Sequence, residues 1–155
     1  MQLFESVIVT TEDNEVAGFT LSLENGTEID VNYSFQFSEL GGIGKFRVVL
    51  DKEPIGNVVF DITSGDATEM SVSPSTLTFT TGNWNSHQLV TLTGVDDDII
   101  DGTKSTVVTI AINTDQTETN YDGVASRTIG VNVTDDDTPG FTVVVPKTEL
   151  VDSGT

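Results

Sequence analysis

Apolar and polar side chains alternate along most of the chain, and this period of two is typical of β-strands that are buried on one face. In residues 46–50, for example, Phe46, Val48 and Leu50 fall on one face of an extended strand. The same alternation recurs in residues 19–23, 58–62, 77–79, 90–92, 108–112 and 129–133. Turn-forming pairs such as Asn25-Gly26 separate these segments. The pattern predicts an all-β chain of about seven strands, without helices.

Short strands at this spacing, joined by turns, are typical of an immunoglobulin-like antiparallel β-sandwich. Residues 24–38 depart from the regular spacing, because they are longer than an ordinary connection between two strands. We therefore expect an inserted loop or hairpin over residues 24–38. Its aromatic residues Tyr33, Phe35 and Phe37 would either be buried by that hairpin or contact a ligand.

Two parts of the chain repeat the same succession of a strand, an acidic junction and a Gly-Phe-Thr segment. The first ends at Gly18 and Phe19, and the second ends at Gly140 and Phe141. Repetition of this kind is typical of tandem modules. We expect residues 1–17 to be the end strand and acidic linker of a preceding repeat, residues 18–137 to be one whole β-sandwich repeat, and residues 138–155 to be the start of the next repeat.

The composition narrows the possible partners. Asp and Glu number 25 against 6 Lys and Arg, which gives a net charge of -19. This charge argues against nucleic acid and anionic membrane surfaces as partners. The chain has no cysteine and therefore no disulfide. It has no apolar span suited to membrane insertion and no signal peptide at its start, so we expect a fragment of a longer secreted protein.

The acidic residues come in clusters, and most of the clusters follow predicted strands. A further acidic run, residues 12–15, lies in the expected linker. Counted strand by strand, the acidic loops of residues 18–137 alternate with the other loops, so they should gather at one end of the sandwich. The acidic residues expected there are Glu39, Asp66, Asp96, Asp97, Asp98, Asp101, Asp135, Asp136 and Asp137, and Glu69 shares a loop with Asp66.

Such a gathering of carboxylates is unfavourable unless a cation lies among them. Two unit charges about 5 Å apart repel by about 3 kcal/mol at an effective dielectric constant of about 20. Hard oxygen ligands in loops favour Ca²⁺ over transition metals, and magnesium suits such a site less well. His87 is the single histidine and fits a surface position better than a ligand position. The alternative is that the Asp-rich turns are simply solvated.

Several of these segments resemble the Calx-β family, and more closely its bacterial tandem type in large surface proteins and adhesins. The resemblance covers about residues 18–141. Its most specific parts are Pro-Ser-x-Leu-Thr-Phe-Thr at residues 74–80, Asn-Trp-Asn at residues 83–85 and Thr-Gly-Val-Asp-Asp-Asp at residues 93–98. The resemblance implies calcium bound by the acidic residues named above. Lys104 stands where exchanger-type members have another acid, which argues against a second or third ion at that loop.

Three functions are compatible with these residues. The first is a calcium-binding spacer in an extracellular or cell-surface protein, with neighbouring repeats of the same chain as partners. The second is a regulatory calcium sensor. The third is an adhesion module that contacts a glycan or protein of a host or cell surface through residues 24–38. The chain shows no nucleophile motif, and its paired acids lack an aromatic cleft, so we expect no enzymatic activity.

Overall fold

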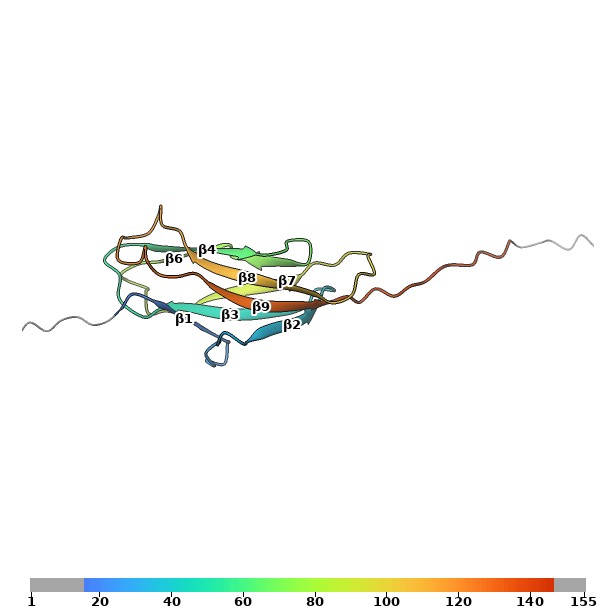
Figure 1. Cartoon of the computed structure of the whole chain (residues 1–155), viewed down its shortest axis with the longest axis horizontal. Helices are drawn as coiled ribbons and strands as arrows, with labels where there is room; N and C mark the ends of the chain where they lie inside the picture. The colour runs from blue at the N-terminus through green and yellow to red at the C-terminus, as the bar shows by residue number, and fades with distance from the viewer. Residues whose placement is uncertain (1–15, 147–155) are drawn as a thin grey trace, which may run out of the picture.

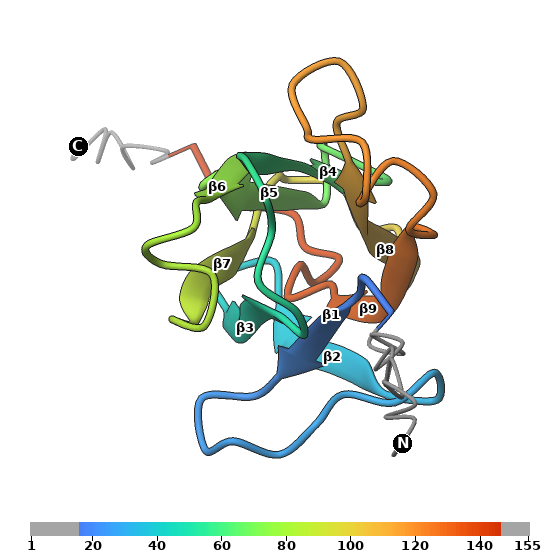
Figure 2. The same cartoon turned by 90° about the vertical axis from the view of Figure 1, so that its left-hand side faces the viewer.

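The computed structural model describes residues 16–146, which form nine strands in two facing sheets (Figures 1 and 2). The strands are β1 (Phe19–Ser22), β2 (Ser34–Ser38), β3 (Ile43–Leu50), β4 (Val58–Ser64), β5 (Met70–Ser73), β6 (Thr76–Phe79), β7 (Gln88–Gly94), β8 (Lys104–Ile112) and β9 (Arg127–Thr134). These strands and sheets confirm the predicted all-β sandwich. Within the same residues, no helix could cross a membrane.

The two sheets have the strand orders β1-β3-β7-β5 and β2-β9-β8-β4-β6. Neighbouring strands pair antiparallel, with the exception of β2 and β9, which run parallel. The antiparallel sandwich expected from the sequence is thus confirmed, and this one parallel pair is a local departure from it. The pairing places the last strand of the sandwich between β2 and β8.

The core between the sheets comes from the alternation seen in the sequence. On β3, Phe46, Val48 and Leu50 are buried, while the residues between them face outward. From the other sheet, Phe60 contacts Phe19 edge to face, with 4.9 Å between ring centroids. Full burial of one such side chain stabilises a fold by about 1.5–3 kcal/mol, so this apolar layer holds the two sheets together.

The seven predicted segments all correspond to strands, and β5 and β2 are additional. β5 is a four-residue edge strand that follows directly on the acidic loop after β4 and pairs with β7. Its segment, Met-Ser-Val-Ser, ends just before Pro74 and is too short to distinguish from a turn by pattern alone.

Residues 24–38 are only partly the loop or hairpin expected from the sequence. Their last five residues form β2, which pairs with β9 and not within the segment. Phe35 and Phe37 stand opposite Val131 and Val133 and are buried in the core. Their burial, together with the long-range parallel pairing, makes β2 an integral strand of the five-stranded sheet.

The two ends of the sandwich are built from different loops. We call residues 38–42, 65–69, 95–103 and 135–137 the acidic end, because β2, β4, β7 and β9 all finish there. The opposite end consists of residues 51–57, 80–87 and 113–126. Residues 138–146 extend away from the acidic end without forming a strand (Figure 1). The expected end strand and acidic linker of a preceding repeat lie almost wholly in residues 1–15, outside the described residues, as do residues 147–155 of the expected next repeat.

Candidate metal centre

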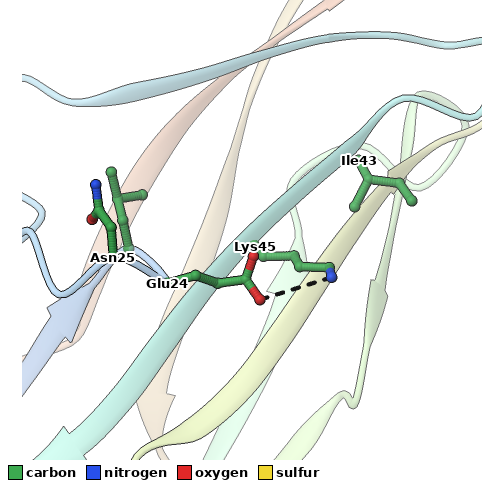
Figure 3. Close-up of a pocket in the computed structure, with 5 residues that line it drawn as sticks. Glu24, Asn25, Ile43 and Lys45 are labelled. Atoms are coloured by element: carbon green, nitrogen blue, oxygen red, sulfur yellow. Dashed lines mark ion pairs between the residues drawn. The ribbon is translucent and has the colours of Figure 1, made fainter.

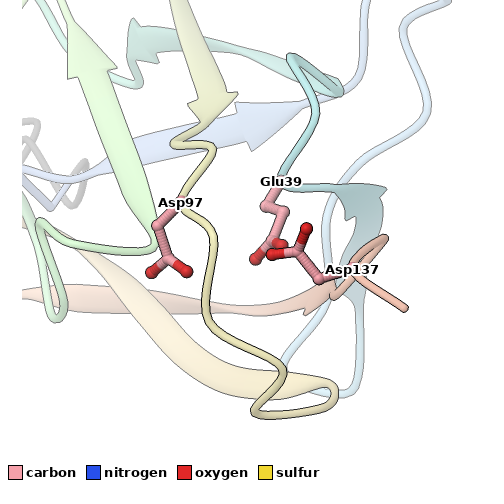
Figure 4. A group of neighbouring side chains, drawn as sticks. All are labelled: Glu39, Asp97 and Asp137. Atoms are coloured by element: carbon pink, nitrogen blue, oxygen red, sulfur yellow. The ribbon is translucent and has the colours of Figure 1, made fainter. Parts of the chain in front are cut away.

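Five carboxylates from three segments meet at the acidic end. Oxygen atoms of Glu39, Asp97 and Asp137 lie within 4.8 Å of one another, and so do oxygen atoms of Glu39, Asp96 and Asp136. Figure 4 shows Glu39, Asp97 and Asp137 extending from three different segments toward the same region. Glu39 belongs to both groups and is therefore the centre of the cluster.

The ends of the strands fix these side chains. Glu39 follows directly on β2, and its backbone N–H donates to the carbonyl of Thr134 at the end of β9, with a donor–acceptor distance of 3.1 Å. In the loop after β7, the N–H of Ile99 donates to Oδ1 of Asp97 over 2.6 Å. After β9, the N–H of Asp137 donates to Oδ1 of Asp135 over 2.7 Å. Each acidic segment is thus ordered by local hydrogen bonds.

Glu39 is buried without a full set of hydrogen-bond donors. Only 2% of its surface is exposed, and its Oε1 has no hydrogen-bond partner. Oδ2 of Asp137 is also buried without a partner. A buried carboxylate oxygen without a donor is costly, because it loses water and gains nothing in return.

Electrostatics agree with this geometry. Burial raises the pKa of Glu39 above its ordinary value, and the negative charges of Asp135, Asp97 and Asp136 raise it further. Burial likewise raises the pKa of Asp137, and nearby acidic residues add to the effect. Both groups therefore resist ionisation in the protein alone, and a cation between them would remove that resistance.

Asp135 has a different environment. Its Oδ2 accepts hydrogen bonds from the backbone N–H groups of Asp101 and Gly102, at 2.9 and 2.7 Å. The bonds from Gly102, Asp137 and Asp101 lower the pKa of Asp135. Asp135 thus stays ionised and attaches the loop of residues 95–103 to the end of β9.

Asp66, Glu69 and Asp101 form a second acidic group at the same end, and Lys104 lies among them. Nζ of Lys104 is 3.1 Å from Oδ2 of Asp101. The hydrogen bond and charge of Asp101 raise the pKa of Lys104, and the charges of Glu69 and Asp66 contribute. Burial is the main cause of the raised pKa of Glu69, which is 5% exposed. Lys104 therefore supplies a cation to this group from within the chain.

The structure thus brings together some of the predicted ligands and gives the others different contacts. Glu39, Asp96, Asp97, Asp136 and Asp137 form the two oxygen clusters. Asp98 lies close enough to raise the pKa of Asp137, whereas Asp101 and Asp135 join the loops through backbone hydrogen bonds and the ion pair.

Asp66 is outside both clusters. Its Oδ1 accepts hydrogen bonds from the N–H and hydroxyl of Thr68, at 3.0 and 2.6 Å, which lower its pKa. In the same loop, the buried acid is Glu69. The sequence signal for this difference is the position of Glu69 directly before Met70, the buried first residue of β5.

The donor set fits Ca²⁺ chemically. Within the described residues, the clustered ligands are carboxylate oxygens from separate loops, which is the ligand type and flexibility that calcium prefers. His87 precedes the start of β7 and so lies at the opposite end. The soft or nitrogen ligands that favour zinc or copper are therefore missing from these two clusters.

The ligand-binding expectation for residues 24–38 finds less support. Phe35 and Phe37 are buried and offer no surface to a ligand, whereas Tyr33 is half-buried and packs edge to face against Phe35. A shallow hollow of about 520 Å³ does lie beside the start of this stretch (Figure 3). It is lined by Leu23, Glu24, Asn25, Ile43 and Lys45, and these include no aromatic platform for a sugar ring.

The chain matches no family model and no curated protein. Among solved structures, it is similar to the apo form of the Calx CBD1 domain, with 17% sequence identity, a TM-score of 0.50, and coverage of 79% of this chain and 100% of that one. It is also similar to the E. coli chaperone DraB, with 8% identity, a TM-score of 0.51, and coverage of 81% and 58%. A third structure, the calcium binding domain CBD12 of CALX1.1, has 16% identity, a TM-score of 0.47, and coverage of 78% and 44%. The first two likenesses show a shared β-sandwich fold, which is the fold that the resemblance seen in the sequence implies.

Proposed function

We propose that this chain is a calcium-binding module, with the ion held by Glu39, Asp96, Asp97, Asp136 and Asp137. The observation behind this proposal is the burial of Glu39, whose Oε1 lacks a donor at the meeting point of both oxygen clusters. A divalent cation would satisfy this oxygen and offset both the burial and the repulsion that raise the pKa of Glu39. A merely solvated acidic surface would leave these oxygens in water.

The module would serve as a spacer in a longer protein built from similar repeats, as the bacterial tandem Calx-β type does. Two features support this role. Residues 138–146 leave the sandwich at the acidic end (Figure 1), and they expose Phe141 and Val143 by 88% and 68%. Phe141 aligns with Phe19, which is buried in this sandwich, so this segment would form the first strand of a following module and the core of that module would cover both side chains. The ion would then lie at the junction of two modules.

An extracellular or cell-surface location follows from this proposal, because calcium is abundant there and can fill a site of modest affinity. Neighbouring repeats would be the main partners, and a glycan or protein of another surface would be a secondary one. The proposal assigns no catalytic role to the carboxylates, since their task is to bind the ion.

Thermal unfolding with calcium and with a chelator tests the binding proposal. At a free calcium concentration of 100 times Kd, one site stabilises the folded state by about 2.7 kcal/mol. For a domain of this size, this amounts to a rise in Tm of roughly 6–15 °C. Isothermal titration should show heat of binding over the same concentration range. An unchanged Tm together with no heat would contradict calcium binding.

Small-angle scattering tests the spacer role. The sample is residues 1–139 joined directly to a second copy of residues 18–155, which keeps the spacing of the repeats, and it is measured with and without calcium. A spacer should become straighter and stiffer as calcium is added, whereas a regulatory sensor should change shape over a narrow calcium range. Profiles that do not respond to calcium, from a protein that binds it, would contradict both roles.

A further inference from the structure

The position of Glu39 depends on how closely two backbone segments approach each other. Residues 38 and 39 leave β2 and pass directly beside Gly94, the last residue of β7. The N–H of Gly94 donates to the carbonyl of Gly42 over 2.9 Å, and the N–H of Gly42 donates to the carbonyl of Ser38 over 2.9 Å. The chain between the two sheets is thus folded tightly over the end of β7.

A side chain at residue 94 would not fit in this arrangement. A Cβ atom there would lie 2.3 Å from the carbonyl oxygen of Ser38, 2.8 Å from Cα of Glu39 and 2.9 Å from its carbonyl oxygen. Real Cβ atoms do not approach other atoms so closely, and all three are backbone atoms that no rotamer change can move. Any side chain at residue 94 must therefore push residues 38 and 39 away from β7.

We propose that Gly94 is a positioning residue for the ion site, because its missing side chain lets Glu39 reach Asp96 and Asp97. These two aspartates follow Gly94 in the chain by two and three residues, so they keep their place relative to β7. A shift of Glu39 away from β7 becomes a shift away from both aspartates. The inference rests on the proposed calcium binding and adds the residue that sets the geometry of the site.

Calcium coordination is sensitive to such a shift. Calcium–oxygen distances lie at about 2.3–2.6 Å, so a displacement of several tenths of an ångström at one ligand weakens its bond to the ion. Because Glu39 belongs to both oxygen clusters, its displacement would disturb both. Residues that only position metal ligands typically change affinity by about ten- to a hundredfold when they are replaced.

The test compares Gly94→Ala with Gly123→Ala by calcium titration calorimetry on the whole chain. Gly123 is a matched control, since it lies at the opposite end and a Cβ there would meet nothing within 4 Å. We expect Gly94→Ala to weaken calcium binding about ten- to a hundredfold and Gly123→Ala to leave it unchanged. Wild-type affinity in Gly94→Ala would overturn the inference, and so would an equal loss in both variants. Absence of binding to the wild-type chain would instead overturn the proposed function.

A double-mutant cycle separates positioning from general destabilisation. If Gly94 acts through Glu39, then Gly94→Ala should change calcium affinity less than about twofold in a Glu39→Gln background. Gly94→Ala should still lower the Tm of the calcium-free protein in the Glu39→Gln background, because its clash is with backbone atoms that Glu39→Gln leaves in place. An undiminished loss of affinity in the Glu39→Gln background would overturn the inference.

Glu39→Asp provides a second test that leaves the backbone at residue 94 intact, and it decides the question if Gly94→Ala does not fold. This substitution withdraws the carboxylate by one methylene group while keeping its charge. If the position of Glu39 is set as tightly as proposed, Glu39→Asp should lose nearly as much affinity as Glu39→Gln. Wild-type affinity in Glu39→Asp would overturn the inference.

Discussion

The two ends of the sandwich differ in how their polar groups are satisfied. At the opposite end, the hydroxyl of the buried Tyr121 donates to the carbonyl of Lys52 over 2.5 Å. Acidic residues at that end also have donors, since Oε2 of Glu118 accepts from the N–H of Asn120 over 2.6 Å. At the acidic end, Glu39 and Asp137 each have a buried oxygen without a donor.

The difference shows that acidic residues alone do not indicate an ion site. Both ends contain aspartate and glutamate, but the described residues form close carboxylate clusters only at the acidic end. At the opposite end, groups of the protein supply the hydrogen-bond donors and acceptors that Tyr121 and Glu118 need. At the acidic end, buried oxygens of Glu39 and Asp137 have no donor from the protein. An external cation should therefore affect one end and not the other.

The largest expected effect comes from Glu39→Gln, which keeps the shape of the side chain and removes its charge. Without calcium, this variant should be at least as stable as the wild type, because the buried charge of Glu39 is unfavourable. With calcium, it should lose most of the calcium-dependent stabilisation. Urea unfolding with calcium and with a chelator measures both effects. Glu118→Gln is the matched control, and a calcium-dependent loss in that variant would contradict the contrast between the ends.

Tyr121→Phe should produce the next largest effect, and it probes the end that needs no ion. The substitution removes the hydrogen bond from the hydroxyl of the buried Tyr121 to the carbonyl of Lys52, which costs about 0.5–1.5 kcal/mol. This loss should be the same with calcium and with a chelator, as measured by urea unfolding. A loss that depended on calcium would show that the two ends are coupled.

The pH dependence of stability should change sign with calcium. In the calcium-free protein, the raised pKa values of Glu39, Asp137 and Glu69 mean that the folded state binds protons more tightly than the unfolded state. Their stabilising contribution is full below the ordinary values of 4.5 for Glu and 3.8 for Asp, and it is lost as the pH rises through the raised values. The Tm of the chelated protein should therefore rise as the pH falls from neutral toward the ordinary value of 4.5 for Glu.

Calcium should reverse this trend, because protons then compete with the ion for the same oxygens. Below pH 3.8, both forms should lose stability as Asp66 and Asp135, whose pKa values are lowered, take up protons. Scanning calorimetry between pH 3 and 7 measures these curves. Parallel curves with and without calcium would contradict an ion site at Glu39.

The smallest expected effect comes from Lys104→Gln. The substitution removes the positive charge beside Asp101 and leaves the neighbouring Glu69 and Asp66 without it. The Tm of the calcium-free protein should fall by no more than about 3 °C, since a partly exposed ion pair contributes little. The fall in Tm should be smaller in high salt, because salt screens the repulsion among the carboxylates around residue 104. Thermal unfolding at two salt concentrations measures it, and an increase in Tm would contradict the assigned role of Lys104.

The fold was largely predictable because its core strands alternate strictly. Phe46, Val48 and Leu50 show this directly, since each is buried as the pattern predicts. β2 has the same local alternation, but its partner β9 is far away in the sequence and parallel. No local pattern distinguishes such a strand from one arm of a hairpin, so the sequence predicts an insertion over residues 24–38.

The sequence predicts where the site lies in the fold, but it predicts less well which acidic residues form it. Strand direction alone places the acidic loops at one end. Which carboxylates become buried depends on backbone contacts, such as that of Gly94 with Ser38 and Glu39, which the sequence does not reveal. Asp66 is a predicted ligand that lies outside both clusters, and its Oδ1 accepts hydrogen bonds from Thr68.

The parallel pair of β2 and β9 has a mechanical consequence. β9 lies between β2 and β8, and the chain leaves the sandwich from its end. Because ladder hydrogen bonds lie across the strands, tension applied beyond residue 137 would strain both ladders in shear and could not peel them apart one bond at a time. Such an arrangement would resist extension at the acidic end until both ladders of β9 gave way together.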